Sequence, residues 1–171
     1  MNPFILLFLL VCMTLPFYMP LVHLKMTENL MPIEVNIGFN STCVKISAPN
    51  IPPISTCNQV PQEISQIIPN FSTIKNLYIA GFTILGIASL LSFKKDMSDS
   101  NILFGLLILG SILSMISLGM LLSSVNINTT QFPGDIGFNK SFNPSVYFNL
   151  VLIAPIIILY TLNSKFNFIK I

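Results

Sequence analysis

The chain has 171 residues, of which 53% are hydrophobic and only 8% are charged, and its formal net charge is +2. A soluble domain normally carries about 25% charged residues, so this composition excludes an ordinary water-exposed surface and favours lipid as the solvent. The small net charge also argues against a nucleic-acid partner, because phosphate binding needs clustered Lys and Arg side chains.

Four apolar segments approach or exceed the length of about 20 residues that a membrane-spanning helix needs. They cover residues 3–24, 77–93, 102–122 and 146–162. The last three contain no charged residue, and in lipid a single segment satisfies its backbone hydrogen bonds only as a helix. We therefore expect one membrane domain over residues 1–171, an all-α bundle of four spans with outer segments at about 25–76 and 123–145.

The first apolar segment has a second interpretation, because "FILLFLLVCMTL" would also serve as the hydrophobic part of a cleaved signal peptide. No basic residue precedes this stretch, and no pair of small residues with cleavage-site spacing follows it. Signal peptides normally have both features, so a retained span is the favoured interpretation. Both interpretations place the next segment on the same side of the membrane.

The first outer segment alternates apolar with polar or small residues over residues 33–39, as a half-buried strand does. A turn near residues 40–42 would lead to a second strand through residues 44–46. An isolated hairpin is marginally stable in water, so a third strand is expected near residues 54–60. These strands would form a small outer β-sheet supported by the helix ends.

Cys43 and Cys57 lie in this outer segment, whereas Cys12 lies within the first expected span. A disulfide is stable on the oxidising side of a membrane, and closing a loop of this length is worth roughly 3 kcal/mol. Two thiols and the distant His23 do not complete a tetrahedral metal site. We expect a structural Cys43–Cys57 disulfide joining the second and third strands, a free Cys12, and no metal or other cofactor.

Four Asn-x-Ser/Thr triplets, the acceptor pattern for N-glycosylation, all fall in the two expected outer segments. They begin at Asn40, Asn70, Asn128 and Asn139. Asn40 and Asn139 are expected to be the better acceptors, because Asn70 and Asn128 lie close to a span.

Lysines mark the opposite side of the membrane. The short segments there hold Lys94, Lys95, Lys165 and Lys170. Dense lysine in short loops indicates the cytoplasmic side, so we expect both chain ends in the cytosol. The protein would then belong to the plasma membrane or the endomembrane system.

Small residues recur at helical spacing in two of the expected spans, and such residues let membrane helices approach closely. They are Gly81, Ala88 and Ser92 in the second span, and Gly110, Ser114 and Ser117 in the third. We expect packing within the chain, with a dimer face as the alternative. Pro155 is expected to kink the fourth span.

No enzyme motif is present. His23 has no acidic partner nearby in the sequence, and the last three spans lack the ionisable residues that mark ion and proton paths. We therefore expect no catalytic residue and no enzymatic activity.

The order of these features resembles the claudin-like four-span membrane proteins, a group that includes the peripheral myelin proteins and related fungal proteins. The likeness consists of a short first span, a first outer segment with two cysteines and strand-like alternation, three more spans and a shorter second outer segment. In that group the two cysteines are bridged across a β-sheet, which implies the same for Cys43 and Cys57. The family's Trp-containing motif ahead of the first cysteine is absent, since the chain has no Trp, and the cysteine spacing is wider. The resemblance therefore implies architecture and disulfide, but neither junction formation nor pore residues.

Together these features predict a membrane glycoprotein with a structural, adhesive or membrane-organising role. Its expected partners are membrane lipid and either a second copy or other membrane proteins. One alternative is a small accessory subunit of a larger transporter or channel complex. Another is a hydrophobic organelle-encoded subunit of an energy-converting complex, in which the glycosylation triplets would be coincidental.

Overall fold

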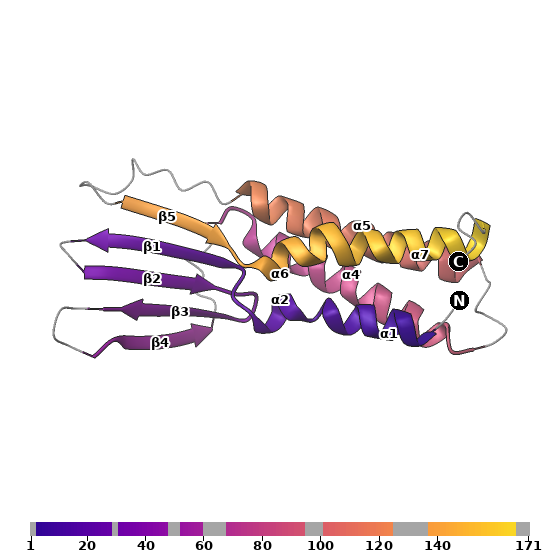
Figure 1. Cartoon of the computed structure of the whole chain (residues 1–171), viewed down its shortest axis with the longest axis horizontal. Coiled ribbons are helices and arrows are strands. Elements are labelled where there is room, and N and C mark those ends of the chain that lie inside the picture. Colours follow the sequence, from indigo (N-terminus) through magenta and orange to yellow (C-terminus); the bar gives the residue numbers. More distant parts are fainter. Residues whose placement is uncertain are drawn as a thin grey trace.

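A computed structural model describes residues 3–28, 31–47, 52–59, 68–94, 101–124 and 137–166. In this part of the chain, a bundle of helices lies at one end of an elongated molecule, and a five-stranded antiparallel sheet lies at the other (Figure 1). The fold is therefore mixed rather than all-α. The expectation of an all-α protein with a small β insert was wrong in this respect, because five strands come together instead of three.

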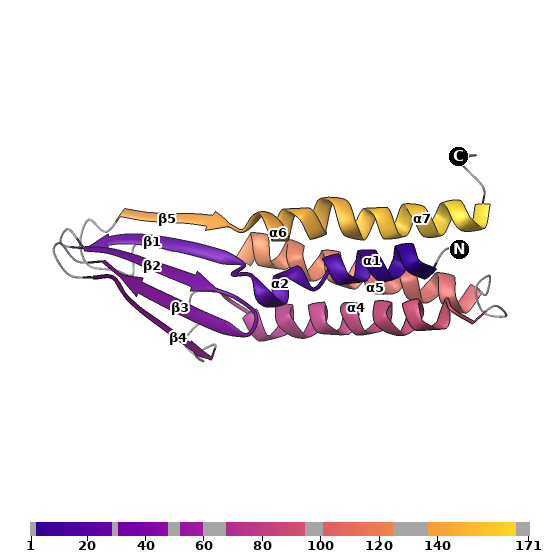
Figure 2. The same ribbon diagram turned by 60° about the horizontal axis from the view of Figure 1, so that its bottom comes forward.

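Four helical segments run along the bundle in the described part of the chain (Figure 2). They are α1 (Pro3–Cys12) with the short α2 (Leu15–Tyr18); α4 (Phe71–Leu91); α5 (Asn101–Ser124); and a continuous segment of α6 (Pro144–Tyr147), the π-helical η2 (Phe148–Ile153) and α7 (Ala154–Phe166). Among the described residues, three stretches are long and apolar enough to cross a membrane, namely Phe71–Leu91, Asn101–Ser124 and Pro144–Asn163. The first segment, Pro3–Tyr18, is apolar but shorter.

The first apolar segment is not one continuous helix. Helix α1 ends at Cys12, Pro16 lies at the start of α2, and a strand begins at Val22. Proline lacks an N–H group, and its ring clashes with the preceding helical turn. Residues 22–24, which their apolar character placed at the end of a span, therefore belong to the sheet.

The first outer segment contributes four strands to the sheet and the second contributes one. The strands are β1 (Val22–Glu28), β2 (Met31–Ile37), β3 (Ser41–Ile46), β4 (Ile54–Gln59) and β5 (Gly137–Phe142). Their order in the sheet is β4-β3-β2-β1-β5. Strands β2, β3 and β4 correspond to the three strands expected in the first outer segment, whereas β1 and β5 were not expected.

In the part of the chain that the structure describes, two clusters of buried apolar side chains hold the elements together. The larger cluster joins the sheet to the helix ends and includes Val22, Ile37, Phe39, Tyr78 and Leu121. The second lies inside the bundle among α1, α4, α5, η2 and α7. The sheet is therefore packed onto the bundle and is not a separate unit on a linker.

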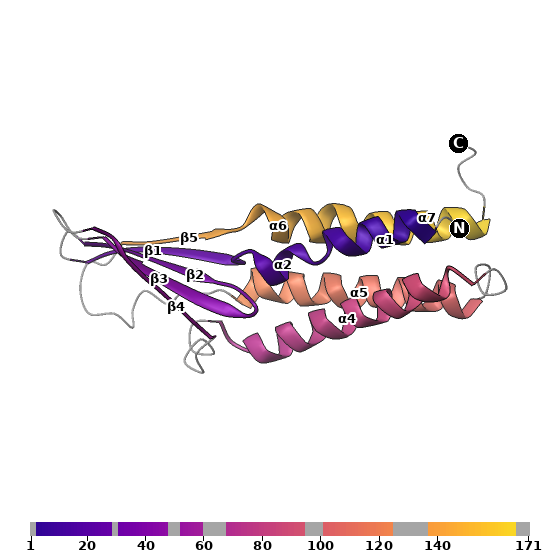
Figure 3. The same ribbon diagram turned by 90° about the horizontal axis from the view of Figure 1, so that it is seen from below.

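The start of α1 and the end of α7 lie at the end of the bundle that is away from the sheet (Figure 3). The last turn of α4 and the first turn of α5 lie at the same end. Lys94, which follows α4, and Lys165, in the last turn of α7, therefore belong to this end. Lys95 and Lys170 lie outside the described residues.

Candidate functional site

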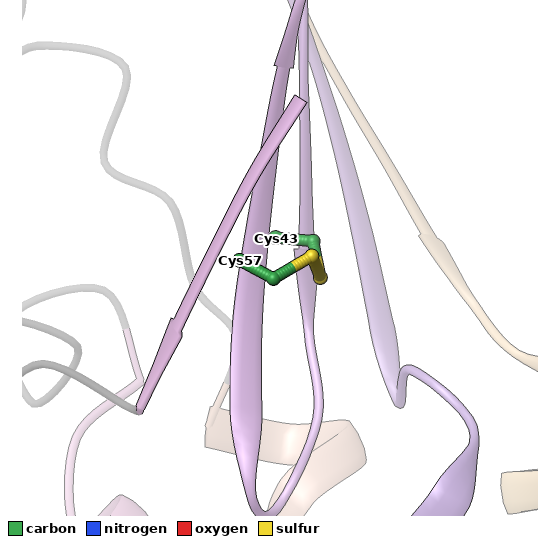
Figure 4. The surroundings of a disulfide bond; sticks show 2 residues. All are labelled: Cys43 and Cys57. Carbon is green, nitrogen blue, oxygen red and sulfur yellow. A yellow bond between two sulfur atoms is a disulfide. The ribbon is translucent and has the colours of Figure 1, made fainter. Parts of the chain in front are cut away.

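Cys43 of β3 and Cys57 of β4 form a disulfide, as expected (Figure 4). The two cysteines are direct cross-strand partners in the antiparallel β3–β4 pair. All six residues of β4 are exposed, so this edge strand contributes little to the buried core. The disulfide and the backbone ladder hold β4 on the sheet. Cys12 forms no disulfide and is partly buried in α1.

One face of the sheet carries the polar residues of the central strands. Asn36 of β2 pairs with His23 on one side and with Cys43 on the other. Side chains alternate between the two faces along a strand, so Lys25, two residues beyond His23, lies on this face too. The Nδ1 atom of His23 contacts the Oδ1 atom of Asn36. We call this the polar face.

A row of charged residues crosses the polar face. Lys25 Nζ lies 3.0 Å from Glu34 Oε1, and Lys45 is paired with Glu34 on the opposite side. The hydrogen bond from Lys25 and the positive charge of Lys25 hold the pKa of Glu34 below its ordinary value, with a smaller contribution from Lys45. The pair lies on the surface, so its contribution to the stability of the sheet is small.

The opposite face of the sheet is apolar, and the bundle covers only part of it. Val22, Leu24 and Ile37 are buried there against the helix ends. Further from the bundle, the cross-strand pair Ile46 and Ile54 remains exposed at 41% and 61% of its surface. Burial on this face therefore declines along β3 with distance from the helices, and β4 is exposed throughout.

An aromatic cluster joins the sheet to the bundle. Phe39, in the turn after β2, has no exposed surface. Its ring centroid lies 5.2 Å from that of Tyr78, 5.8 Å from that of Phe17 and 6.1 Å from that of Phe71. Aromatic pairs at these separations add stability beyond the area that they bury. The β2–β3 turn is thus inserted between α2 and α4.

The glycosylation triplets occupy different environments. Asn40 lies in the β2–β3 turn, is exposed, and donates from its Nδ2 to the carbonyl of Phe17 at 3.3 Å. Asn70 immediately precedes α4 in a left-handed conformation, with φ of 61°. Asn139 is an exposed residue of β5 paired with Lys25, and Asn128 lies outside the described residues. Because β2 runs back towards the bundle, Asn40 is much closer to the helices than its sequence position suggested.

The small residues of α4 and α5 are buried inside the chain. A Cβ atom at Gly81 would lie 2.8 Å from the carbonyl oxygen of Gly110, and a Cβ at Gly110 would lie 2.9 Å from that of Gly81. Ser117 donates from its Oγ to the carbonyl of Ile74 at 2.6 Å, from α5 to α4. Ala88, Ser92 and Ser114 are also buried. These six residues are all buried within the chain, which agrees with the expected packing inside one molecule.

The fourth helical segment contains a buried polar residue that the sequence analysis did not assign to a site. Asn149 lies in η2 with no exposed surface and donates from Nδ2 to the carbonyl of Ser145 at 2.9 Å. Pro155 is the second residue of α7, two positions after η2 ends at Ile153. A proline cannot donate the usual backbone hydrogen bond, and the N–H of Ala154, the residue before it, donates to the carbonyl of Asn149 five residues earlier. The helix is therefore irregular just before Pro155, and the expected kink stays a prediction.

Neither protein-family models nor curated protein sequences match this chain. Among the residues that the structure describes, no group of three or more His, Cys, Asp or Glu side chains could hold a metal ion. The functional argument therefore rests on the geometry of the sheet and of its junction with the bundle.

Proposed function

We propose that the chain is a four-span membrane glycoprotein of the claudin-like kind, whose outer sheet serves a structural, adhesive or membrane-organising role without catalysis. The observation that carries this proposal is the pairing of β5 with β1, from Val22 opposite Phe142 to Thr27 opposite Gly137. It joins the first and second outer segments in one sheet. Both segments must then lie on the same side of the membrane.

The arrangement of the helix ends bears on the orientation. The ends of α1 and α7 that are nearer the chain ends lie away from the sheet (Figure 1), which supports chain ends in the cytosol and a sheet on the outer side. Lys94 lies at the same end as these helix ends, in agreement with the cytoplasmic preference of lysine.

The surface of the first helical segment supports its placement in the membrane as a fourth span. Phe4, Phe8 and Val11 of α1 are exposed at 71%, 66% and 58% of their surface. In water, leaving a large apolar side chain exposed costs about 1.5 to 3 kcal/mol relative to burying it. Lipid removes this cost, because the side chain is then in contact with hydrocarbon. The 16 residues from Pro3 to Tyr18 would measure about 24 Å if fully helical, against a hydrocarbon core of about 30 Å. A short span that ends at the outer interface is consistent with these lengths.

The outer sheet supports a role in contact and organisation. The disulfide fixes β4, which is otherwise fully exposed, and the aromatic cluster fixes the sheet to the bundle. The bridge between neighbouring strands also supports the claudin-like resemblance. A sheet held at a fixed angle to the membrane is suited to presenting a surface to a neighbouring membrane protein or a second copy.

Topology and assembly can be tested in one preparation of sealed microsomes. A tag at the C-terminus should be digested by added protease without permeabilisation, because the cytosolic side of microsomes faces outward, whereas a tag inserted after residue 47 should be digested only after permeabilisation, because it lies in the lumen. In intact cells carrying the protein at the surface, the tag after residue 47 should instead be accessible. Protection of the C-terminal tag in sealed microsomes would overturn the orientation.

Assembly is tested by cross-linking in intact membranes followed by native gel electrophoresis in mild detergent. A membrane-organising protein should appear alone or in multiples of its own mass. Recovery only in one larger complex of fixed composition would favour an accessory subunit instead.

A further inference from the structure

A cavity of about 160 Å³ lies where the foot of the polar face meets the end of α2. Tyr18, Met19 and Pro20, which close α2 and lead into β1, form its apolar side. Asn36 of β2 and Ser41 of β3 form its polar side. The cavity therefore has one side that favours hydrocarbon and one that offers hydrogen bonds.

The position of the cavity corresponds to the outer membrane interface in the proposed orientation. Tyr18 at the end of α2 is 84% exposed, and Tyr147 at the end of α6 is 47% exposed. Tyr18 ends α2 four residues before β1 begins, and Tyr147 lies in the first turn of the helical segment that follows β5. Exposed tyrosines gather at the level of lipid headgroups, where the ring is half in hydrocarbon and the hydroxyl is in water. The cavity between Tyr18 and the polar face thus opens at headgroup depth.

The polar side of the cavity offers hydrogen-bond donors without a formal charge. Asn36 contacts His23 through its Oδ1 atom, so the NH₂ group of Asn36 takes no part in that contact. Ser41 adds a hydroxyl to the lining. Of the described residues that line the cavity, none is charged. An anionic headgroup is normally recognised by Lys or Arg, so this lining suits a headgroup that carries its own cation beside its phosphate.

We propose that this cavity binds the headgroup of a zwitterionic phospholipid of the outer leaflet. Phosphate oxygens accept hydrogen bonds from Asn36 and Ser41, and the ammonium group lies over the ring of Tyr18, as cations do on aromatic faces. The acyl chains run down the exposed side of α2 and α1. This inference rests on the proposed membrane orientation but not on the proposed adhesive role.

The test uses the full chain in nanodiscs of equimolar phosphatidylcholine and phosphatidylglycerol, extracted in mild detergent and examined by native mass spectrometry. The unaltered protein should retain phosphatidylcholine preferentially. The variant Ser41→Phe fills the cavity and leaves the Asn40-x-Thr42 triplet in place. Retention in this variant should fall at least about tenfold, the effect of losing one hydrogen bond to a charged group. The matched control is Ser55→Phe, at an exposed position of β4 that does not line the cavity.

A second pair of variants guards against misfolding of the Ser41→Phe protein. Tyr18→Leu removes an exposed ring while keeping an apolar side chain, and it should also lower phosphatidylcholine retention. Tyr147→Leu makes the same change at the other exposed interfacial tyrosine and should leave retention unchanged. Equal retention of the two lipids by the unaltered protein, or equal loss in the paired variants, would overturn the site. Neither result would affect the cross-linking and native-gel test of the proposed function.

Discussion

The hydroxyl of Tyr78 in α4 donates a hydrogen bond of 2.7 Å to the carbonyl of Met13, at the break between α1 and α2. In a continuous helix the N–H of Phe17 would donate to this carbonyl, but here it donates to Thr14 at 2.9 Å. Met13 and Tyr78 have no exposed surface, so the carbonyl has no access to water. Tyr78 therefore compensates for the interruption that Pro16 imposes.

Replacing Tyr78 by Phe should lower the stability of the protein by about 1 to 2 kcal/mol, because it leaves the buried Met13 carbonyl without a donor. The measurement is thermal unfolding of the purified protein in detergent. Tyr147→Phe is the matched control, since its hydroxyl is on an exposed side chain, and it should unfold like the unaltered protein. Equal midpoints for the two variants would show that the Met13 carbonyl does not depend on Tyr78.

The contact between Gly81 and Gly110 predicts a selective effect of alanine. A Cβ at Gly81 would lie 2.5 Å from the Oγ of Ser114 and 2.8 Å from the Gly110 carbonyl, so α4 and α5 would have to separate. Gly81→Ala should cost roughly 1 to 3 kcal/mol, as overpacking does. Gly86→Ala and Gly105→Ala are matched controls on the same two helices, because a Cβ at either position meets nothing within 4 Å.

The two controls should be neutral or stabilising by up to about 1 kcal/mol, since alanine favours helix over glycine. Midpoints of unfolding in detergent distinguish the cases. A Gly81→Ala protein as stable as the controls would mean that the two helices are not in close contact at this point.

Loss of the disulfide should act mainly on β4. Cys43→Ser or Cys57→Ser should each cost about 2 to 5 kcal/mol in a small outer domain of this kind. The double variant should be no worse than either single one, because one bond cannot be lost twice. Since β4 is wholly exposed, hydrogen exchange should rise first over residues 54–59.

The control for the disulfide variants is Cys12→Ser, since Cys12 forms no disulfide. Mass spectrometry of non-reduced peptides gives the direct test of the pairing. If either outer cysteine were found joined to a second chain, the disulfide would be intermolecular and the predicted intramolecular pairing would be wrong.

Acid should weaken the outer sheet through Glu34. Lys25 holds the pKa of Glu34 below its value of 4.5 in the unfolded chain. The folded state therefore gains stability that is fully present above pH 4.5 and is lost as the pH falls through the lowered pKa of the folded state. Because both side chains are on the surface, the effect should be small and should diminish at high salt.

The measurement is the difference in unfolding midpoint between the unaltered protein and Glu34→Gln as a function of pH. The difference should be present at neutral pH and should shrink below pH 4.5. A difference that is independent of pH would show that the carboxylate charge is not what Lys25 recognises.

The sequence predicted those parts of the fold that depend on local patterns. Long apolar runs without charge predicted the three longer helical segments, and alternation over residues 33–39 predicted β2. The Cys43–Cys57 pairing was predictable because the two cysteines share the outer segment and Cys12 does not. Each of these inferences needs only neighbouring residues and the solvent that surrounds them.

The missed elements depend on long-range pairing. In β1, Val22 and Leu24 alternate with His23 and Lys25, but their place directly after an apolar run hid this alternation. Strand β5 has no comparable apolar period and is ordered by its backbone pairing with β1, a partner more than a hundred residues away. The cavity was equally unpredictable, because it exists only where the β2–β3 turn folds back onto α2.

This fold-back changes which glycosylation triplet should be used. From their distance to the spans in the sequence, Asn40 and Asn139 were expected to be equally good glycosylation acceptors. In the structure, however, Asn40 contacts the carbonyl of Phe17 in α2. Asn139 precedes the start of α6 at Pro144 by five residues, which at about 3.3 Å per extended residue places it roughly 16 Å beyond the helix. A glycan at Asn40 would meet α2 and the membrane surface, whereas one at the exposed Asn139 would project into solvent.

Asn139→Gln should therefore remove most of the glycosidase-sensitive shift in gel mobility, and Asn40→Gln should remove little. Thr42→Ala is not a suitable substitute for Asn40→Gln, because Thr42 is buried on the apolar face of the sheet and its loss would disturb packing. Ser141→Ala is a useful second disruption of the Asn139 triplet, since Ser141 is exposed on β5. It should reproduce the effect of Asn139→Gln while keeping the asparagine. A shift that persists in both Asn139-triplet variants and disappears in Asn40→Gln would place the β2–β3 turn away from the membrane, contrary to its insertion between α2 and α4.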